Sequence, residues 1–274
     1  MSKFNNILLT YNESHSNSQG IANQIVSDHS QFYNFSKISE SKLENHELNS
    51  IDLIITIGGD GTILRAAHKV SELTIPILGI NTGRVGFMSE LESDNFKKDI
   101  KSYLDGKARI EMRAMLEANV KNLDTMHALN DITVARGKVL RVIEVSTEIN
   151  YVHLSTYRGD GVVVSSPTGS TAYALSLGSP VMDPLSENIL LKPIATHMSQ
   201  FGGVVVGKDA RIKLTVFTRN DAILNIDGFK DIQMENNDSV EIRISDRKVA
   251  FLRMQNPDQY WGALSRRLGI RKSN

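Results

Sequence analysis

The chain has 274 residues with 31 basic and 31 acidic side chains, and this zero formal net charge argues against a nucleic-acid-binding protein that relies on bulk electrostatic attraction. Its 41% hydrophobic and 23% charged residues are typical of an ordinary globular protein, long enough for one large or two modest domains. The absence of cysteine excludes disulfides, thiolate nucleophiles and cysteine-ligated zinc, and no apolar run approaches the roughly 20 residues of a membrane span, so we expect a cytoplasmic protein without membrane contact.

The N-terminal part of the chain alternates between apolar strands and amphipathic helices. Strands that are apolar throughout and separated by helices are typical of a parallel sheet covered on both faces. We therefore predict a Rossmann-like α/β domain over residues 1–106, its last helix stopped by Gly106. Its strands are predicted at residues 7–11, 53–57 and 75–80.

The second of these strands runs directly into a glycine-rich turn, Gly58-Gly59-Asp60-Gly61-Thr62, that opens a helix. Glycines let a ligand approach the main chain, and the free N–H groups at the start of a helix favour negative charge. The turn therefore predicts a phosphate site formed by Gly58, Gly59, Gly61 and Thr62. Asp60 is placed to accept a hydrogen bond or a proton from a sugar hydroxyl. Such turns also merely close loops in many α/β proteins, so this motif alone leaves a structural role open.

The next part of the chain changes to short strands. Residues 211–216 and 240–244 alternate between apolar and polar side chains, as in an antiparallel sheet, and Asp227-Gly228 is typical of a hairpin turn. We predict an antiparallel β-sandwich domain over residues 107–253. The tail has the spacing of an amphipathic helix, and we expect residues 254–274 to pack back onto the first domain.

A second polar cluster lies in this β half. An apolar strand there separates a charged pair, Arg158 and Asp160, from the hydroxyl-rich segment 165–176. Hydroxyls, the aromatic ring of Tyr173 and the carboxylate of Asp160 form a suitable lining for a nucleoside.

A purely structural interpretation of the same cluster is also open. Residues 167–169 would form a turn, Ser170 or Thr171 would cap a helix, and Tyr173 would pack in the core. This interpretation does not explain why so many small polar groups gather beside two charged residues.

Four segments, taken together, resemble the NAD kinase family in their order and spacing: residues 58–62, 79–87, 128–131 and 166–173. The Gly-Gly-Asp-Gly piece is shared with lipid kinases and phosphofructokinases, whereas the Thr-Gly-Ser-Thr-Ala-Tyr piece at this distance behind it is highly specific. The resemblance runs over nearly the whole chain and implies a small α/β domain beside a β-sandwich. It implies phosphorylation of the 2′-hydroxyl of the adenosine ribose of NAD, which gives NADP.

The resemblance also implies roles for individual residues. Asp60 would be the proton acceptor for the 2′-hydroxyl, Arg65 would lie near the phosphates, and Asn130 would bind the nucleotide through its side-chain amide. The remaining residues that the resemblance assigns to the NAD pocket are Gly61, Asp131, Arg141, Arg158, Asp160, Thr171, Ala172, Tyr173, Ala174, Leu175, Ser176 and Ala195.

Two positions depart from the family pattern. Asp131 stands where the family commonly has Glu, so the carboxylate reaches one methylene less far. Phe229 follows the Asp-Gly turn where relatives often carry a polar residue such as Gln, and we therefore leave Phe229 out of the predicted site.

The resemblance implies ATP as co-substrate, a divalent ion such as Mg²⁺ that arrives with the phosphates of the donor, and a homo-oligomer, either a dimer or a tetramer. The seven histidines show no H-E-x-x-H motif, so we expect no metal held by the protein itself. Polyphosphate would meet the same glycine turn as ATP, so the donor stays open. Two other functions also stay open: an NAD(P)-binding regulatory protein without catalysis, and a lipid or small-molecule kinase that shares only the Gly-Gly-Asp-Gly turn.

Overall fold

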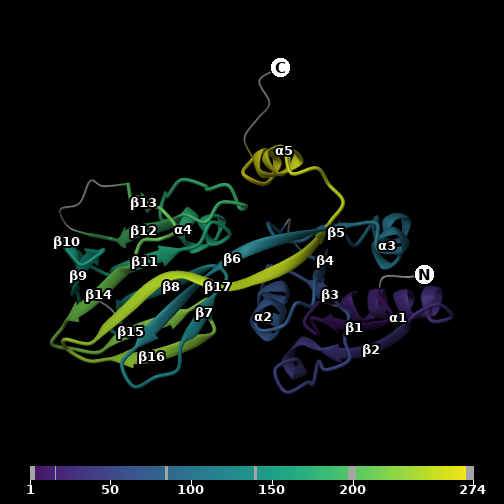
Figure 1. Ribbon diagram of the computed structural model, residues 1–274, viewed down its shortest axis with the longest axis horizontal. Helices are drawn as coiled ribbons and strands as arrows, with labels where there is room; N and C mark the ends of the chain where they lie inside the picture. Colours follow the sequence, from purple (N-terminus) through teal and green to yellow (C-terminus); the bar gives the residue numbers. More distant parts are fainter. Residues whose placement is uncertain (1–3, 16, 84–85, 139–140, 197–201, 270–274) are drawn as a thin grey trace. The chain divides into compact units, whose positions relative to one another are not determined.

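The computed structural model describes residues 4–15, 17–83, 86–138, 141–196 and 202–269 (Figure 1). The chain divides into two compact units, which we call the α/β unit (Met1–Met112 with Val249–Asn274) and the β unit (Arg113–Lys248). The chain passes from one unit to the other within the long strands β6 (Arg109–Val120) and β17 (Ser239–Arg253). Within the described ranges, no helix has both the length and the apolar character needed to cross a membrane.

The α/β unit is built on a parallel sheet. Its elements in chain order are β1 (Asn6–Tyr11), α1 (Ser18–His29), β2 (Asn34–Ser39), a short 3-10 helix (Glu40–Lys42), β3 (Leu53–Gly58), α2 (Asp60–Val70), β4 (Ile77–Asn81), β5 (Leu91–Glu92) and α3 (Phe96–Leu104). Strand β1 pairs with β2 and β3, β4 continues the sheet beside β3, and the end of β17 pairs with β4 (Figure 1). All of these pairs are parallel, which confirms the predicted Rossmann-like α/β fold.

Helices cover both faces of this sheet. Ile21 of α1 and Ile100 of α3 pack in one cluster with Leu9 and Ile55. On the opposite face, a Cβ on Gly79 of β4 would touch Ile63 of α2. Every residue of β3 and β4 is buried, which is why these strands carry no alternation of polar and apolar residues.

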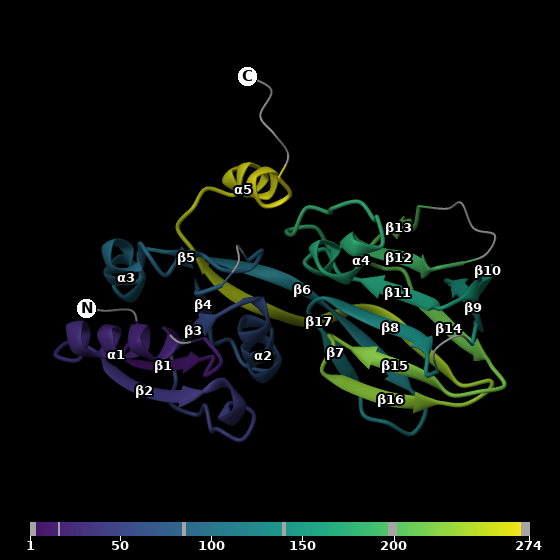
Figure 2. The ribbon, with the colours of Figure 1, turned by 180° about the vertical axis from the view of Figure 1, so that it is seen from behind.

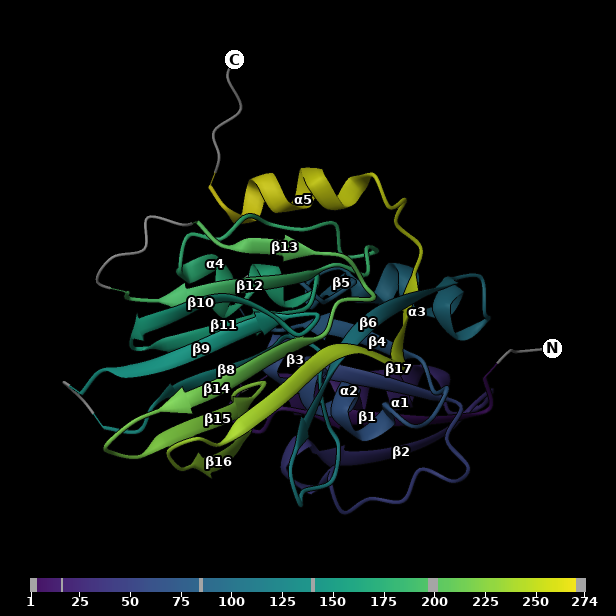
Figure 3. The ribbon, with the colours of Figure 1, turned by 60° about the vertical axis from the view of Figure 1, so that its left-hand side comes forward.

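The β unit consists of two antiparallel sheets with one core. Its further elements are β7 (Met126–Ala128), β8 (Asp131–Arg136), β9 (Ile143–Ile149), β10 (Val152–Gly159), β11 (Gly161–Ser165), a 3-10 turn (Gly169–Thr171), α4 (Tyr173–Ser176), β12 (Ile189–Ile194), β13 (Val204–Val206), β14 (Ile212–Phe217), β15 (Ala222–Ile226) and β16 (Lys230–Met234). One sheet has the order β13-β12-β11-β8-β15-β16, and in the other β10 pairs with β9, β9 with β14, and β14 with β17 (Figure 3). Because apolar residues of both sheets form a single cluster, the predicted β-sandwich is confirmed.

Two local predictions in this part of the chain are also confirmed. Asp227 and Gly228 connect β15 to β16 with φ angles of 52° and 73°, the left-handed values that a tight hairpin turn requires. The tail forms helix α5 (Gln259–Arg267), and Gly269 follows it with a φ of 64° (Figure 2).

Candidate functional site

Asp60 is the first residue of α2 and follows the buried strand β3 almost directly. Its Oδ2 atom accepts a hydrogen bond from the main-chain N–H of Phe87 at 2.7 Å, and its Oδ1 atom accepts one from Met88 at 3.1 Å. A Cβ on Gly86 would collide with the same carboxylate, so a side chain at position 86 would push the Asp60 carboxylate out of this position. These contacts fix the direction of the carboxylate. Each oxygen keeps a second lone pair, with which it can accept a hydrogen bond from a ligand hydroxyl.

The glycines of the turn differ in what surrounds them. A Cβ on Gly58 would overlap the side chain of Thr62, so the fold itself requires glycine at position 58. Among the residues that the structure describes, a Cβ on Gly59 or Gly61 would meet nothing within 4 Å, and neither residue has a positive φ. Neither the packing of the described residues nor the backbone conformation therefore accounts for glycine at these two positions. The open space lies beside the first amides of α2, and an anionic group that approaches the main chain would fit it.

The other predicted residues of this unit take different positions. Both donors of Thr62 are used within the fold, because its hydroxyl donates to Glu40 at 2.5 Å and its N–H to the Gly59 carbonyl at 3.0 Å. Arg65, one turn further along α2, is exposed. In the segment 79–87 that carried the resemblance, Arg84 and Val85 lie outside the described residues.

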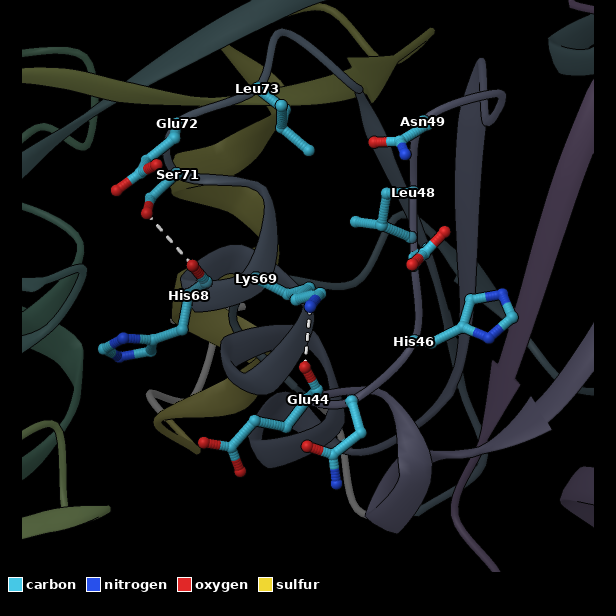
Figure 4. A pocket seen from close by; sticks show the side chains of 11 residues that line it. Glu44, His46, Leu48, Asn49, His68, Lys69, Ser71, Glu72 and Leu73 are labelled. Carbon is cyan, nitrogen blue, oxygen red and sulfur yellow. Dashed lines mark hydrogen bonds between the residues drawn. The ribbon is translucent and has the colours of Figure 1, made fainter.

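A pocket of about 550 Å³ lies at the other end of α2 (Figure 4). Within it the Lys69 ammonium donates to the carbonyl of Glu44 at 2.6 Å, while the side chains of His46 and His68 point in different directions. The last carbonyls of a helix carry negative partial charge. This pocket is therefore less suited to a phosphate than the turn at the start of the same helix.

In the β unit, the segment around Asn130 lies against the hydroxyl-rich segment. The N–H of Ser166 donates to the carbonyl of Asn130 at 2.8 Å, and the Ser166 hydroxyl donates to the carbonyl of Leu129. A Cβ on Gly169 would overlap the carbonyl of Asn130. The structure thus joins two of the segments on which the family resemblance rests.

Asp227, which the sequence marked only as a turn residue, holds the same segment. Its carboxylate accepts the main-chain N–H groups of Leu129 at 2.6 Å and of Asn130 and Asp131 at 2.8 Å each. Three consecutive amides on one buried carboxylate fix the main chain that carries the Asn130 side chain. An Asp-Gly pair favours a hairpin turn whether or not such contacts exist, so the sequence carried no separate signal for this role.

Asp131 lies next to this carboxylate and is only 6% exposed. Burial and the negative charge of Asp227 raise the pKa of Asp131 to about 7, although a hydrogen bond from the Thr133 hydroxyl opposes the shift. Burial also raises the pKa of Tyr173, and the charges of Asp131 and Asp160 add to this effect.

Arg158 and Asp160, the two charged residues near the hydroxyl-rich segment, have different ion-pair partners. The Nε atom of Arg158 lies 3.9 Å from Glu144, whereas the Asp160 carboxylate lies 3.1 Å from Arg136 at the end of β8. The reason is the backbone between β10 and β11. The Asp160 N–H donates to Ile194 and its carbonyl accepts the N–H of Arg136, so the side chain is held beside β8 and not back along β10. Arg136 is a neighbour of the candidate site that the sequence analysis missed.

The structural interpretation of the hydroxyl-rich segment is wrong at two points. Tyr173 is 44% exposed and so is not a core residue. Neither Ser170 nor Thr171 caps α4, because the N-cap is Ala172 and each hydroxyl donates inside the turn, to Pro167 at 2.6 Å and to Thr168 at 3.0 Å. The turn itself uses these hydroxyls, and the aromatic ring is left accessible.

The remaining predicted residues of the β unit differ in how deeply they are buried. Ala174 is fully buried and packs with Met182 and Leu190. Leu175 is half-buried, Ser176 and Arg141 are exposed, and Ala195 follows β12 with a φ of 46°. Asn130, Asp131, Asp160 and Tyr173 thus belong to the β unit, whereas Gly59, Asp60 and Gly61 belong to the α/β unit.

Comparison with protein families matches both parts of the chain. A model described as the ATP-NAD kinase N-terminal domain matches residues 4–108, and a model described as the ATP-NAD kinase C-terminal domain matches residues 129–254. A protein named NAD kinase from Dehalococcoides mccartyi is 39% identical over 227 residues, which are 81% of this chain and 80% of that protein. A protein of the same name from Natranaerobius thermophilus is 36% identical over 214 residues, which are 76% of this chain and 75% of that protein.

Two solved structures are similar to this one. The crystal structure of yeast NADH kinase complexed with NADH covers 99% of this chain and 89% of its own chain, with a TM-score of 0.87 and 22% sequence identity, a likeness of fold alone. An NAD kinase from Archaeoglobus fulgidus in complex with ATP covers 97% of this chain and 100% of its own, with a TM-score of 0.79 and 27% identity.

Proposed function

Because this chain belongs to the ATP-NAD kinase family, we propose that it transfers the terminal phosphoryl group of ATP to the 2′-hydroxyl of the adenosine ribose of NAD, with Asp60 as the proton acceptor. Membership confirms the resemblance that the four segments carried. It makes the chain an enzyme of the kinase class. The two alternatives, a regulator without catalysis and a kinase that shares only the glycine turn, are not favoured.

The role of Asp60 is supported by the direction of its carboxylate, which two main-chain N–H groups fix, and by the open space at the neighbouring Gly59 and Gly61. A ribose hydroxyl is too weak an acid for a carboxylate to ionise it in the ground state. Asp60 would therefore orient the hydroxyl and take its proton late, as the new P–O bond forms. General-base assistance of this kind is typically worth about 10²–10⁴-fold in rate.

The donor's phosphates would lie against the main chain of Gly59 and Gly61, with Arg65 one turn away. Phosphoryl transfer requires mostly positioning and neutralisation of charge. Among the residues that the structure describes, no three His, Asp or Glu side chains are grouped so as to hold a metal ion. In this proposal a divalent ion such as Mg²⁺ would arrive with the donor's phosphates and neutralise their charge.

The dinucleotide would be bound by Asn130, Asp160 and Tyr173 of the β unit. The Asn130 amide and the Asp160 carboxylate can form hydrogen bonds with sugar hydroxyls and base N–H groups. The accessible ring of Tyr173 can pack against a flat, apolar face of the dinucleotide. Arg141, Arg158 and Ala195 would complete the edge of this pocket, as the resemblance implies. The proposal also includes a homo-oligomer, either a dimer or a tetramer, and a cytoplasmic location.

The test is an assay with NAD, Mg²⁺ and either ATP or polyphosphate, in which any NADP is detected by an NADP-specific dehydrogenase. We expect product with ATP. Parallel reactions with NADH show whether the reduced dinucleotide is accepted, and light scattering gives the number of subunits. If NADP binds tightly but none is formed with any donor, the proposed activity is wrong.

A further inference from the structure

The segment that holds Asp60 is itself held from its other side. Met88 donates its N–H to the Asp60 carboxylate at 3.1 Å, and its carbonyl accepts a hydrogen bond from Nη2 of Arg253 at 2.8 Å. One residue thus connects the proposed proton acceptor with the guanidinium group at the end of β17. All of these atoms belong to the α/β unit.

Arg253 is held in turn by buried partners. Its Nη1 atom lies 3.4 Å from Glu90, its Nε atom lies 3.5 Å from Glu111, and its guanidinium carbon lies 5.0 Å from the centre of the Phe251 ring. The side chains of the arginine and of both acids are at most 7% exposed. Because a guanidinium is planar with its donors in a rigid fork, these contacts together determine where its remaining N–H groups point.

Glu90 anchors the C-terminal end of the segment 87–90 through several hydrogen bonds. Its Oε1 atom accepts hydrogen bonds from the hydroxyl of Tyr103 at 2.8 Å and from the main-chain N–H groups of Met254 at 2.8 Å and Gln255 at 3.2 Å. Its own N–H donates to the carbonyl of Gly79 in β4 at 3.0 Å. Residues 87–90 are therefore fixed to the sheet, to α3 and to the chain that follows β17.

Stability alone is a weak explanation for this network. A buried ion pair contributes little net free energy, because the loss of hydration offsets most of the attraction, and well-packed apolar residues would often do as well. What the charges add is geometry: they determine the position of the main chain that contacts Asp60. A displacement of about 1 Å at a reacting group can reduce a rate roughly 10²-fold.

We propose that Arg253 and Glu90 are positioning residues for phosphoryl transfer, which hold Phe87 and Met88 so that their amides keep the Asp60 carboxylate directed at the hydroxyl it serves. The inference rests on the proposed role of Asp60. Neither side chain contacts the substrate in this proposal, and both act through the main chain of residues 87–88.

Arg253→Lys is the first test variant, because an ammonium keeps the charge but cannot reach Met88, Glu90 and Glu111 together. We expect kcat to fall roughly 10- to 100-fold while KM for NAD and ATP stays within about threefold. Glu90→Gln is the second variant. It keeps an acceptor of the same shape, removes the charge that faces Arg253, and should lower kcat less but in the same direction.

Tyr33→Phe is the matched control. It removes a hydrogen bond of 2.6 Å between a buried tyrosine and Asp105 in the same unit, a contact that does not involve residues 87–90. It should lower the melting temperature and leave kcat unchanged. If kcat falls as much in Tyr33→Phe as in Arg253→Lys for a similar loss of melting temperature, the network is merely structural and the proposal is wrong.

A double variant separates positioning from other effects. If Arg253 acts through Asp60, adding Arg253→Lys to Asp60→Asn should reduce kcat by no more than about twofold further, since the two losses are not additive. Independent losses that multiply contradict the proposal, and so do folded Arg253→Lys and Glu90→Gln variants with wild-type kcat. If Asp60→Asn itself turns over normally, the fault lies with the proposed role of Asp60 and not only with this network.

Discussion

Gly169 lies so close to the main-chain carbonyl of Asn130 that a Cβ at position 169 would overlap it. Together with the hydrogen bond from Ser166 to the same carbonyl at 2.8 Å, this contact makes the hydroxyl-rich turn and the Asn130 segment one rigid piece. Substitutions at these positions and elsewhere in the candidate site should therefore have specific, measurable effects.

Gly169→Ala should destabilise the protein and weaken NAD binding. The added methyl group has no space, and overpacking of this kind typically costs about 1–3 kcal/mol of unfolding free energy. Urea unfolding and NAD titration measure the two effects. Gly207→Ala is the control, because a Cβ there meets nothing within 4 Å in the part of the chain that the structure describes. Equal stability of the two variants would contradict the packing described for Asn130.

Gly61→Ala should show the opposite combination. Among the described residues its methyl group would meet no side chain or other segment within 4 Å, and alanine favours a helix, so stability should stay unchanged or rise by up to about 1 kcal/mol. Activity should nevertheless fall with a higher KM for ATP, because the methyl group occupies the space proposed for phosphate. If the kcat and KM values of this variant equal those of the wild type, the phosphates of ATP do not bind at this turn.

Asp60→Asn should reduce kcat by roughly 10²-fold or more and leave the NAD dissociation constant within a few-fold. The amide cannot take a proton from the hydroxyl. Its nitrogen would also face one of the two main-chain N–H groups, of Phe87 or Met88, so a melting curve must accompany the kinetics. Near-wild-type turnover would end the assignment of Asp60 as the proton acceptor.

Asp160→Ala should mainly weaken the binding of NAD. The carboxylate is partly accessible, and its ion pair with Arg136 at 3.1 Å lies near the surface, where such pairs contribute little stability. Asp221→Ala, which removes an exposed carboxylate 3.4 Å from Lys138, is the comparison variant. A loss of stability in Asp160→Ala with unchanged affinity for NAD would assign this residue a structural role only.

Asp131 should make the protein less stable as the pH rises from about 4 to about 7. Its pKa is raised to about 7 in the folded state, so over this range the folded protein binds more protons than the unfolded chain, and stability falls with pH. In Asp131→Asn this contribution is absent. Between pH 5 and pH 8, the free energy of unfolding of Asp131→Asn should rise relative to that of the wild type, as measured by urea unfolding. A difference between the two proteins that stays constant with pH would contradict the raised pKa.

Several elements could be predicted because their signals are local. Strands β3 and β4 consist almost entirely of apolar residues, and the glycine turn precedes a helix with a clear apolar face. Strand β2 (Asn34–Ser39) was not predicted, since its Asn, Ser and Lys residues look like a polar loop. It becomes a strand through six parallel register pairs with β1, which the sequence of β2 alone does not reveal.

The candidate site divides in the same way. The sequence determined that a carboxylate would stand in a glycine turn at the start of a helix and that hydroxyls would gather in a second turn, because backbone torsion and helix initiation depend on neighbouring residues. Only the tertiary structure decided what those groups contact. Asp60 accepts hydrogen bonds from main-chain amides 27 and 28 residues away, and the Met88 carbonyl accepts one from a guanidinium group 165 residues away. Contacts at such separation arise when apolar faces are buried together, which determines the neighbours of a polar group but leaves no local pattern in the chain.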